Sequence, residues 1–563
     1  MAAVYGVTRF EFDREKDLEN YAVFLADVVH GTPPWRPLFF MESWGRWVYR
    51  AVQRAAERLS LPTTKGWDAR YIDGYPYLAV IETSEQEVKK REPVFRKRIR
   101  PYIEDFDAIW EQRKTDIMNT YKELKKEYGL KKYGDIKKLS NIELLDLFDD
   151  YMQVDRKQWD IHMEMMVPAY YLFGLFEQMC NELLGFGYTD PLFAKLMAGF
   201  DSMVFKFNKE IWRLGNRAVE LGLDKLFRTT KDDKVLLSGL EDSEAGRKWL
   251  KEYYDFLEVH GWRTERMLDW ATPSWIEKPG LGIPLIKVAI TSGGTYTIDE
   301  RREQAVRERE KAEKEVLDRV PVEQRGWFET LMKAAQKAGY WSEDHNYYLD
   351  LYCNGIGRWI TREIGRRFAG AGVIDDPEDV YFLLADDIEK ALVPMGKNKL
   401  HREVDVRKKE WEGYLKVAPR PYYGNVGLVQ EILRKDPVIS VATSVPIIRK
   451  DVKADLYGAA SSPGVAEGVA RVLVAENNLA ELKSGEILVA PGTSAPWTPA
   501  FEIIKGVVTD GGGALSHAVI LAREYGIPAV TGCLDATKKI KTGDRVKVDG
   551  DLGVVHILRN NKA

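Results

Sequence analysis

The sequence predicts a multidomain protein in which a large, mainly α-helical region, residues 1–450, precedes a small β/α domain, residues 451–563. Long segments with apolar residues at helical spacing on a charged background occur only before residue 450. After it, short valine-rich runs are each bounded by glycine or proline, which is typical of strands. A chain of 563 residues is long enough for about two to four domains, each with its own core.

Three segments of the first region carry the clearest helical pattern. Residues 93–129 have helical spacing throughout, and residues 140–187 predict one long or two consecutive helices, with Ser140 as the cap and Gly185 as the stop. Residues 298–320 form a strongly charged pattern that Pro321 ends. We therefore expect a helical body of two lobes, followed by a hinge from "APRPYYGNVG" (418–427) to about residue 453.

Composition excludes several classes of protein. Hydrophobic residues at 45%, charged residues at 30% and a net charge of −4 describe a soluble globular protein and give no argument for nucleic-acid or membrane partners. No window holds ~18 uninterrupted apolar residues, and the acidic start is unlike a secretory signal. The three cysteines, Cys180, Cys353 and Cys533, form no CxxC pair, so we expect a cytoplasmic protein without disulfides and without a metal site.

The run "TDGGGALSHAVILAREYGIPAVTG" (509–532) is the strongest candidate for chemistry. Its small and polar residues are Gly511, Gly512, Gly513, Ser516 and His517. The glycines predict a tight loop, and Ser516 is placed to cap a helix that begins at His517 and ends at Gly526. The first turn of a helix favours negative charge, which suits a histidine that accepts a phosphoryl group.

Four ordered motifs in the last 110 residues resemble the swivelling phosphohistidine domain of the phosphoenolpyruvate-utilising family. They are "SSPGVAEGVARV" (461–472), "GEILVAPGTSAPWTPAF" (485–501), the run above, and "TGDRVKVDGDLGVV" (542–555). The family includes phosphoenolpyruvate synthase, pyruvate phosphate dikinase and rifampicin phosphotransferase. The resemblance implies that His517 is phosphorylated during turnover, in a pocket shaped by the glycine loop and Ser516. Leu515 departs from the threonine that the dikinases commonly have there, which argues against dikinase chemistry.

Three segments of the helical region, 30–39, 260–279 and 342–388, are similar to the acceptor-binding region of rifampicin phosphotransferase-like enzymes. No basic, glycine-rich phosphate loop precedes residue 450, and the 46 residues after His517 are too few for the family's barrel of ~250 residues. The chain looks most like the histidine-bearing subunit of phenylphosphate synthase. That resemblance implies a separate ATP-grasp subunit that binds ATP and Mg²⁺, a phenol-like acceptor, and the products phenylphosphate, AMP and phosphate.

Activation of the acceptor hydroxyl calls for a base, because a phenol has a pKa near 10. Within the family-like segments, His345 is the first choice and His260 the second, with His30 also present and with Glu343 and Asp344 beside His345. Each histidine alone has a structural alternative.

Two further groups are acceptor-binding candidates. Arg358, Arg362 and Arg366 follow four apart on one helical face and are placed to hold the phosphate, the alternative being an ion-paired structural face. Trp35 is placed to wall an aromatic pocket, the alternative being core packing.

Three functions remain open from the sequence. The chain is the phenol-phosphorylating subunit, or a phosphotransferase for another hydroxylated small molecule such as an antibiotic, or a phosphohistidine carrier that serves a protein partner. The large aromatic-rich region argues against a bare carrier.

Overall fold

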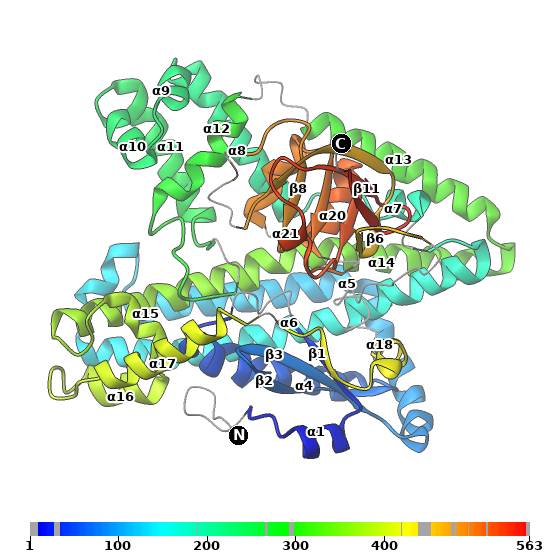
Figure 1. The fold of residues 1–563 in the computed structure, drawn as a ribbon, viewed down its shortest axis with the longest axis horizontal. Helices are drawn as coiled ribbons and strands as arrows, with labels where there is room; N and C mark the ends of the chain where they lie inside the picture. Colours follow the sequence, from blue (N-terminus) through cyan, green and yellow to red (C-terminus); the bar gives the residue numbers. More distant parts are fainter. Residues whose placement is uncertain are drawn as a thin grey trace, which may run out of the picture. The chain divides into compact units, whose positions relative to one another are not determined.

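Figure 1 shows the fold of the protein in a computed structural model. The structure describes residues 10–27, 34–187, 190–264, 268–291, 298–417, 419–436, 452–474, 479, 481–493, 495–513 and 516–558. The chain divides into two compact units, and both are discontinuous in sequence. Unit 1 comprises 1–171, 266–273 and 348–439, and unit 2 comprises 172–265, 274–347 and 440–563. None of the described helices is long and apolar enough for a membrane span.

Unit 1 is built around two long helices and one small sheet. Helix α5 (Glu85–Glu127) begins with a capping box formed by Ser84 and Glu87. Helix α6 (Asn141–Leu184) starts in unit 1 and continues into unit 2. The other helices of unit 1 are α1 (Arg14–Asn20), α3 (Pro37–Phe39), the π-helix η1 (Phe40–Val48), α4 (Tyr49–Leu59), α15 (Tyr352–Gly370), α16 (Ala385–Leu392), α17 (His401–Tyr414) and α18 (Val429–Lys435).

The sheet of unit 1 has four antiparallel strands in the order β2-β3-β1-β4. The strands are β1 (Val23–Ala26), β2 (Thr64–Ile72), β3 (Tyr75–Glu82) and β4 (Tyr422–Gly424). A two-residue turn joins β2 to β3, and both of its residues, Asp73 and Gly74, have positive φ, as such a hairpin requires.

The helices of unit 2 come from the middle of the chain. They include α7 (Pro191–Leu196), α8 (Met203–Glu220), α9 (Asp224–Thr229), α10 (Asp233–Glu241), α11 (Glu244–His260), α12 (Ile283–Thr291), α13 (Ile298–Arg319) and α14 (Arg325–His345). A short π-helix, η5 (Asn346–Leu351), follows α14 and leads into α15 of unit 1.

The C-terminal part of unit 2 contains an eight-stranded sheet in the order β5-β12-β11-β7-β8-β9-β10-β6. The strands are β5 (Leu456–Tyr457), β6 (Ala459–Ser462), β7 (Val465–Val472), β8 (Ile487–Ala490), β9 (Gly506–Thr509), β10 (Ala529–Thr531), β11 (Arg545–Asp549) and β12 (Val554–Ile557). Strands β7 to β10 run parallel, and helix α20 (His517–Tyr525) connects β9 to β10. The apolar side chains of these strands form one buried core.

Several predictions of secondary structure are confirmed. Helix α6 is one long helix that begins after Ser140 and ends before Gly185, and α13 ends before Pro321. The expectation of a free hinge from residue 418 is wrong in part, because β4 lies within that segment and pairs with β1. The segment 437–451, His30 and Leu515 lie outside the described residues.

Candidate active site

His517 is the first residue of α20, at the carboxyl end of strand β9. Gly526 ends this helix in the left-handed conformation, as the sequence predicts. Ser516 occupies the N-cap position, but its hydroxyl makes no capping hydrogen bond. The loop before it turns at Gly512, whose φ of +117° favours glycine, and a Cβ there would lie 2.8 Å from the Ser516 hydroxyl oxygen. The loop therefore has room for glycine alone at this position.

Backbone hydrogen bonds anchor the two flanking glycines. The Gly511 N–H donates to the carbonyl of Pro491 (2.9 Å), and the Ser516 N–H donates to the carbonyl of Gly513 (2.9 Å). The Thr531 hydroxyl donates to the Gly512 carbonyl (3.0 Å). All three glycines are buried. The loop is thereby fixed to the sheet and presents His517 in one place.

The imidazole of His517 contacts Thr493, which follows the neighbouring parallel strand β8. The distance from His517 Nδ1 to Thr493 Oγ1 is 3.0 Å. The ends of adjacent parallel strands meet at the same edge of a sheet, and this brings the two loops together. When the proton lies on Nδ1, it is donated to Thr493, and Nε2 keeps the lone pair that a nucleophile needs.

His517 is buried, with 7% of its surface exposed. Burial, and to a lesser extent the positive charge of Arg263, lowers the pKa of His517 to about 3. The imidazole is therefore neutral at physiological pH. Phe501 contacts the ring edge-on, with 6.2 Å between centroids.

A buried carboxyl faces the other nitrogen of this ring. Glu343, on helix α14, is 2% exposed, and its Oε2 lies 4.0 Å from His517 Nε2. Neither carboxyl oxygen makes a hydrogen bond with any described residue. Burial, followed by the charges of Asp344 and Glu524, raises the pKa of Glu343 well above its usual value. A buried carboxyl without a hydrogen-bond partner is costly, which makes it a candidate functional group.

Polar contacts join the far end of α20 to the helical part of unit 2. Both carboxyl oxygens of Glu524 accept hydrogen bonds from the Gly199 N–H, at 3.0 and 2.8 Å. The side-chain amide of Asn208 donates to the Tyr525 hydroxyl at 3.0 Å. Burial is the main cause that raises the pKa of Glu524 to about 7. The helix that carries His517 is thus held at both ends of its length.

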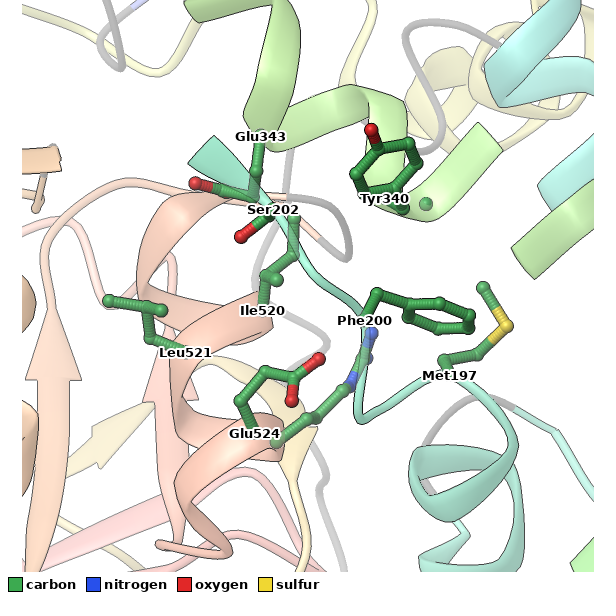
Figure 2. Close-up of a pocket in the computed structure, with 10 residues that line it drawn as sticks. Met197, Phe200, Ser202, Tyr340, Glu343, Ile520, Leu521 and Glu524 are labelled. Atoms are coloured by element: carbon green, nitrogen blue, oxygen red, sulfur yellow. The ribbon is translucent and has the colours of Figure 1, made fainter. Parts of the chain in front are cut away.

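A small cavity of about 30 Å³ lies beside this helix (Figure 2). Figure 2 shows Glu343 reaching from α14 toward α20, with Tyr340 on the same helix and Phe200 on the segment before α8. The cavity is lined by Met197, Phe200, Ser202, Gly339, Tyr340, Glu343, Ile520, Leu521, Arg523 and Glu524. Its volume holds about two water molecules. Glu343 is thus the residue that touches both the cavity and the reactive edge of His517.

The two histidines expected as bases also lie in unit 2. His345 stacks on Trp341, with 4.4 Å between ring centroids, and its Nδ1 lies 3.2 Å from the Trp341 carbonyl oxygen. His260 packs among aromatic rings, and burial lowers its pKa to about 3. Asp344 accepts a hydrogen bond from the Met203 N–H (2.7 Å) at the start of α8. Their roles toward an acceptor stay predictions.

The remaining candidates lie in unit 1. Arg358 is 1% exposed and donates to the Trp270 carbonyl and the Tyr381 hydroxyl, while Glu378 pairs with Arg358 at 3.3 Å and with Arg362 at 2.8 Å. Both guanidinium groups therefore already share a carboxylate. A role in holding phosphate remains a prediction.

Trp35 is fully buried in unit 1 and contacts other aromatic rings. Its ring centroid lies 4.9 Å from that of Trp44 and 5.5 Å from that of Phe39. This is the core-packing arrangement that the sequence left as the alternative. Whether the ring also borders an acceptor stays a prediction.

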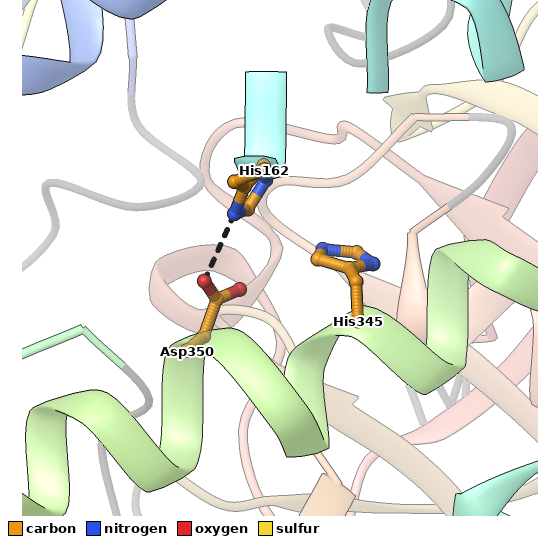
Figure 3. A group of neighbouring side chains, drawn as sticks. All are labelled: His162, His345 and Asp350. Atoms are coloured by element: carbon orange, nitrogen blue, oxygen red, sulfur yellow. Dashed lines mark hydrogen bonds and ion pairs between the residues drawn. The ribbon is translucent and has the colours of Figure 1, made fainter. Parts of the chain in front are cut away.

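His162, which the sequence gave no role, is a hydrogen-bonded histidine of unit 1. Its Nδ1 lies 3.0 Å from the Oδ1 of Asp350, as the dashed line in Figure 3 marks. The amide of Gln158 donates to the same oxygen at 3.1 Å. We assign this buried group to the internal structure of unit 1.

Sequence reasoning did not select the two residues that contact the ring nitrogens of His517. Thr493 lies in a motif quoted for its family resemblance, and its position just beyond a strand adjacent to β9 was a usable signal. Glu343 was noted only as a neighbour of His345. Nothing local in the sequence distinguishes it, because the contact joins α14 to a helix much later in the chain.

Comparison with protein families identifies two stretches of the chain. Residues 482–553 match the PEP-utilising enzyme mobile domain, and residues 162–343 match the fourth domain of rifampicin phosphotransferase. The resemblance to the phosphoenolpyruvate-utilising family that the motifs predict is thereby confirmed.

Curated proteins show the same likeness. An uncharacterized phosphotransferase, YvkC, from Bacillus subtilis is 27% identical over 71% of this chain and 47% of its own length. Rifampicin phosphotransferase from the same organism is 30% identical over 58% of this chain and 36% of its own length. The prodigiosin synthesizing transferase PigC of Serratia marcescens is 49% identical over 19% of this chain and 12% of its own. The chain therefore spans less than half the length of these relatives.

Proposed function

We propose that this chain is a phosphotransferase component that carries a phosphoryl group on Nε2 of His517 and delivers it to the hydroxyl of a small acceptor. The observation that carries the proposal is the environment of His517, a neutral imidazole whose Nδ1 contacts Thr493 and whose Nε2 faces a buried carboxyl. The similarity to proteins named phosphotransferases supports the same activity.

The residues around His517 suit both halves of such a transfer. In the first half, the Nε2 lone pair attacks phosphorus of the donor, and the bond from phosphorus to its leaving oxygen breaks. The proton stays on Nδ1, which donates it in a hydrogen bond to Thr493, so the phosphorylated ring is an imidazolium. In the second half, the acceptor oxygen bonds to phosphorus and the ring leaves as neutral imidazole. Retaining the Nδ1 proton makes the ring a good leaving group without a separate proton transfer to it.

We further propose that the donor is ATP with Mg²⁺, bound on a separate ATP-grasp subunit. The β-phosphoryl group would pass to His517 and the γ-phosphoryl group to water, so that AMP and phosphate are released. This assignment rests on the resemblance to the histidine-bearing subunit of phenylphosphate synthase. The small domain, residues 451–563, would then alternate between the donor subunit and the helical acceptor region, residues 1–450.

For the acceptor we favour phenol or a similar small aromatic alcohol, giving phenylphosphate. The cavity beside α20 is lined by Phe200, Tyr340 and aliphatic side chains, which suit an aromatic ring. At about 30 Å³ it admits no such ring until α20 and α14 separate, and a small phenol needs less separation than a large antibiotic.

An antibiotic acceptor is the second candidate. It is favoured by the match of residues 162–343 to a domain of rifampicin phosphotransferase, since this segment contributes most of the cavity lining. A phosphohistidine carrier that serves only a protein partner is a weaker alternative, because Glu343 and the cavity would then have no substrate to meet.

The test uses ATP labelled in its β-phosphate, a candidate ATP-grasp subunit, and either phenol or rifampicin. We expect acid-labile label on the wild type, none on His517→Ala, and discharge of the label into phenylphosphate when phenol is added. Discharge only to rifampicin selects the antibiotic assignment, and discharge only to a protein selects the carrier. Equal labelling of the wild type and His517→Ala would overturn the proposal.

A further inference from the structure

We infer that Glu343 is the base of the acceptor half-reaction, taking the proton of the acceptor hydroxyl as its oxygen attacks the phosphoryl group on His517. This inference rests on the proposed function and adds a residue to it. The sequence favoured a histidine for this role.

The geometry places one carboxyl between the nucleophile and the cavity. Oε2 of Glu343 lies 4.0 Å from Nε2 of His517, and the same side chain lines the cavity with Tyr340 and Ile520. A phosphoryl group on Nε2 would project into this gap. The gap is too narrow for a phosphoryl group and a hydroxyl together, so the reaction requires α20 to stand further from α14. The hydroxyl of an acceptor that then enters from the cavity meets Glu343 and the phosphorus at the same time.

The carboxyl is buried without a hydrogen-bond partner among the described residues. Both oxygens of Glu343 are covered and unpaired, although a side chain that is only 2% exposed normally satisfies its polar atoms. The neighbouring carboxyl groups form hydrogen bonds with other residues, since Asp344 accepts one from the Met203 N–H and Glu524 accepts one from the Gly199 N–H. Glu343 therefore retains free acceptor positions for a substrate hydroxyl.

The electrostatic surroundings suit a base. The charged or titratable groups near Glu343 are His517 and Glu524 from α20 and Asp344 from its own helix, and Arg523 of α20 and Tyr340 of α14 line the same cavity. Arg263 acts on His517. Burial raises the pKa of Glu343 when α20 is seated, so the carboxyl holds a proton in that state. When α20 stands further from α14, as the transfer requires, the carboxyl is better solvated and ionises, and it can then take the proton of the hydroxyl. His260 is less suited, because burial lowers its pKa to about 3.

The step balances without another reactant. The bond between the acceptor oxygen and phosphorus forms while the bond between phosphorus and Nε2 breaks, and its electron pair returns to Nε2. The hydroxyl proton moves to a carboxyl oxygen of Glu343, and the other ring proton remains on Nδ1, which donates it in a hydrogen bond to Thr493. Glu343 passes its proton to water once α20 moves away and the carboxyl becomes solvated.

The experiment separates this inference from the function on which it rests. The full chain is loaded chemically with phosphoramidate, and discharge of the phosphohistidine is followed by ³¹P NMR in buffer alone and with a series of phenols of decreasing pKa. The variants are Glu343→Gln, which keeps the shape of the side chain, and Glu329→Gln, an exposed position on the same helix, as the control. His517→Ala identifies the signal, and thermal melting checks the fold of each variant.

We expect Glu343→Gln to load normally but to discharge to phenol about 10²-fold more slowly, in the range typical of a lost general base. The defect should shrink as the phenol becomes more acidic, because an acidic hydroxyl needs less help. Glu329→Gln should match the wild type. If phenols accept nothing from the wild type, hydrolysis by water in buffer supplies the same comparison between the two variants.

Each failure has its own signature. Absence of loading on His517 overturns the proposed function itself. Normal loading with equal discharge in the wild type and Glu343→Gln overturns the role of Glu343 and leaves the phosphohistidine intact. A defect of constant size across the phenol series would assign Glu343 to positioning and would also overturn its role as the base.

Discussion

Unit 1 and unit 2 each bury an ionisable side chain on a helix, but its polar atoms are satisfied in unit 1 and unsatisfied in unit 2. Arg358 in unit 1 is 1% exposed and donates to a carbonyl, a hydroxyl and a carboxylate. Glu343 in unit 2 is equally buried, yet its oxygens make no hydrogen bond with any described residue. A buried ionisable group with all its hydrogen bonds formed supports structure, whereas one without hydrogen bonds costs stability and is a candidate functional group. The difference directs the search for chemistry to unit 2.

The largest effect should follow removal of the imidazole at the centre of that unsatisfied site. We expect His517→Ala to lose all acid-labile phosphate, whether the donor is phosphoramidate or ATP with its partner subunit. The matched control is His556→Ala on β12 of the same sheet, which lies opposite Lys547 and away from the loop after β9. Labelling that persists in His517→Ala would mean that the phosphoryl group does not reside on His517, and labelling that is lost in both variants would mean that the loss is not specific to His517.

The C-terminal domain was largely predictable because its signals are local. Strands β7 to β12 each contain valine and have a bounding glycine or proline, and His517 stands at the start of a helix with a clear stop at Gly526. The hairpin of β2 and β3 also carried a local signal, the pair Asp73 and Gly74, but it stands among helical patterns and was missed.

The contacts of the site were less predictable, because they join segments far apart in sequence. Thr493 follows strand β8, so the parallel pairing of β8 with β9 was enough to place it near His517. Glu343 has no such rule, since its approach to His517 depends on how α20 packs against α14. The saturation of Arg358 likewise depends on the distant residues Trp270, Glu378 and Tyr381. Tertiary packing decides which buried charges are left without partners.

The next largest effect should come from the loop that holds the imidazole. In Gly512→Ala a Cβ would meet the Ser516 oxygen at 2.8 Å on a backbone whose φ is +117°. We expect a loss of about 1–3 kcal/mol in the free energy of unfolding and at least a roughly tenfold slower loading of His517. Chemical denaturation and ³¹P NMR measure the two quantities.

The control for the loop is Gly543→Ala, where φ is +97° and no heavy atom lies within 4 Å of the added Cβ. It carries the same backbone strain without the contact. We expect a comparable loss of stability and normal loading. Slow loading in both variants would show that strain anywhere in the domain disturbs His517, and the loop would lose its special role.

A smaller, pH-dependent effect should arise where α20 is held at Glu524. Burial raises the pKa of Glu524 from 4.5 to about 7, so the seated helix binds its proton more tightly than the free helix does. The contribution of Glu524 to seating is therefore fully present below pH 4.5 and is lost as the pH rises through about 7, which changes the seating equilibrium by on the order of a hundredfold. The charges of Arg309 and Arg302 oppose the rise in the pKa of Glu524. The pKa of Glu343 is also raised by burial, so its titration changes seating in the same direction as that of Glu524.

Hydrogen exchange at the Gly199 amide, which donates to Glu524, reports this seating after correction for the intrinsic exchange rate. Glu524→Gln should flatten the dependence between pH 4.5 and 7. His517 contributes the opposite slope, because burial lowers its pKa from 6.5 to about 3 and seating weakens as it is protonated. A wild-type profile unchanged by Glu524→Gln would mean that another group controls the contact.

The smallest effect on transfer should come from unit 1. It tests whether the buried side chain whose hydrogen bonds are formed, Arg358, has only a structural role. Arg358→Met removes the hydrogen bonds to the Trp270 carbonyl, the Tyr381 hydroxyl and the Glu378 carboxylate but leaves Glu378 paired with Arg362 at 2.8 Å. We expect a cost of about 1–3 kcal/mol in the free energy of unfolding, mainly from the Trp270 carbonyl and the Tyr381 hydroxyl left without their donor. Loading of His517 and discharge to phenol should stay at wild-type rates, measured below the lowered melting temperature.

Arg362→Gln completes this test, because Arg362 is one-third exposed and shares Glu378 with Arg358. A structural ion pair at this exposure is worth little, so we expect a change in unfolding free energy within about 1 kcal/mol and no change in discharge. If instead either variant keeps its stability and loses discharge to phenol, the arginine face binds the transferred phosphoryl group. The ion pairs with Glu378 would then exist only in the absence of substrate, and the phosphoryl group would replace Glu378. A buried charge with its hydrogen bonds formed could then also have a role in binding.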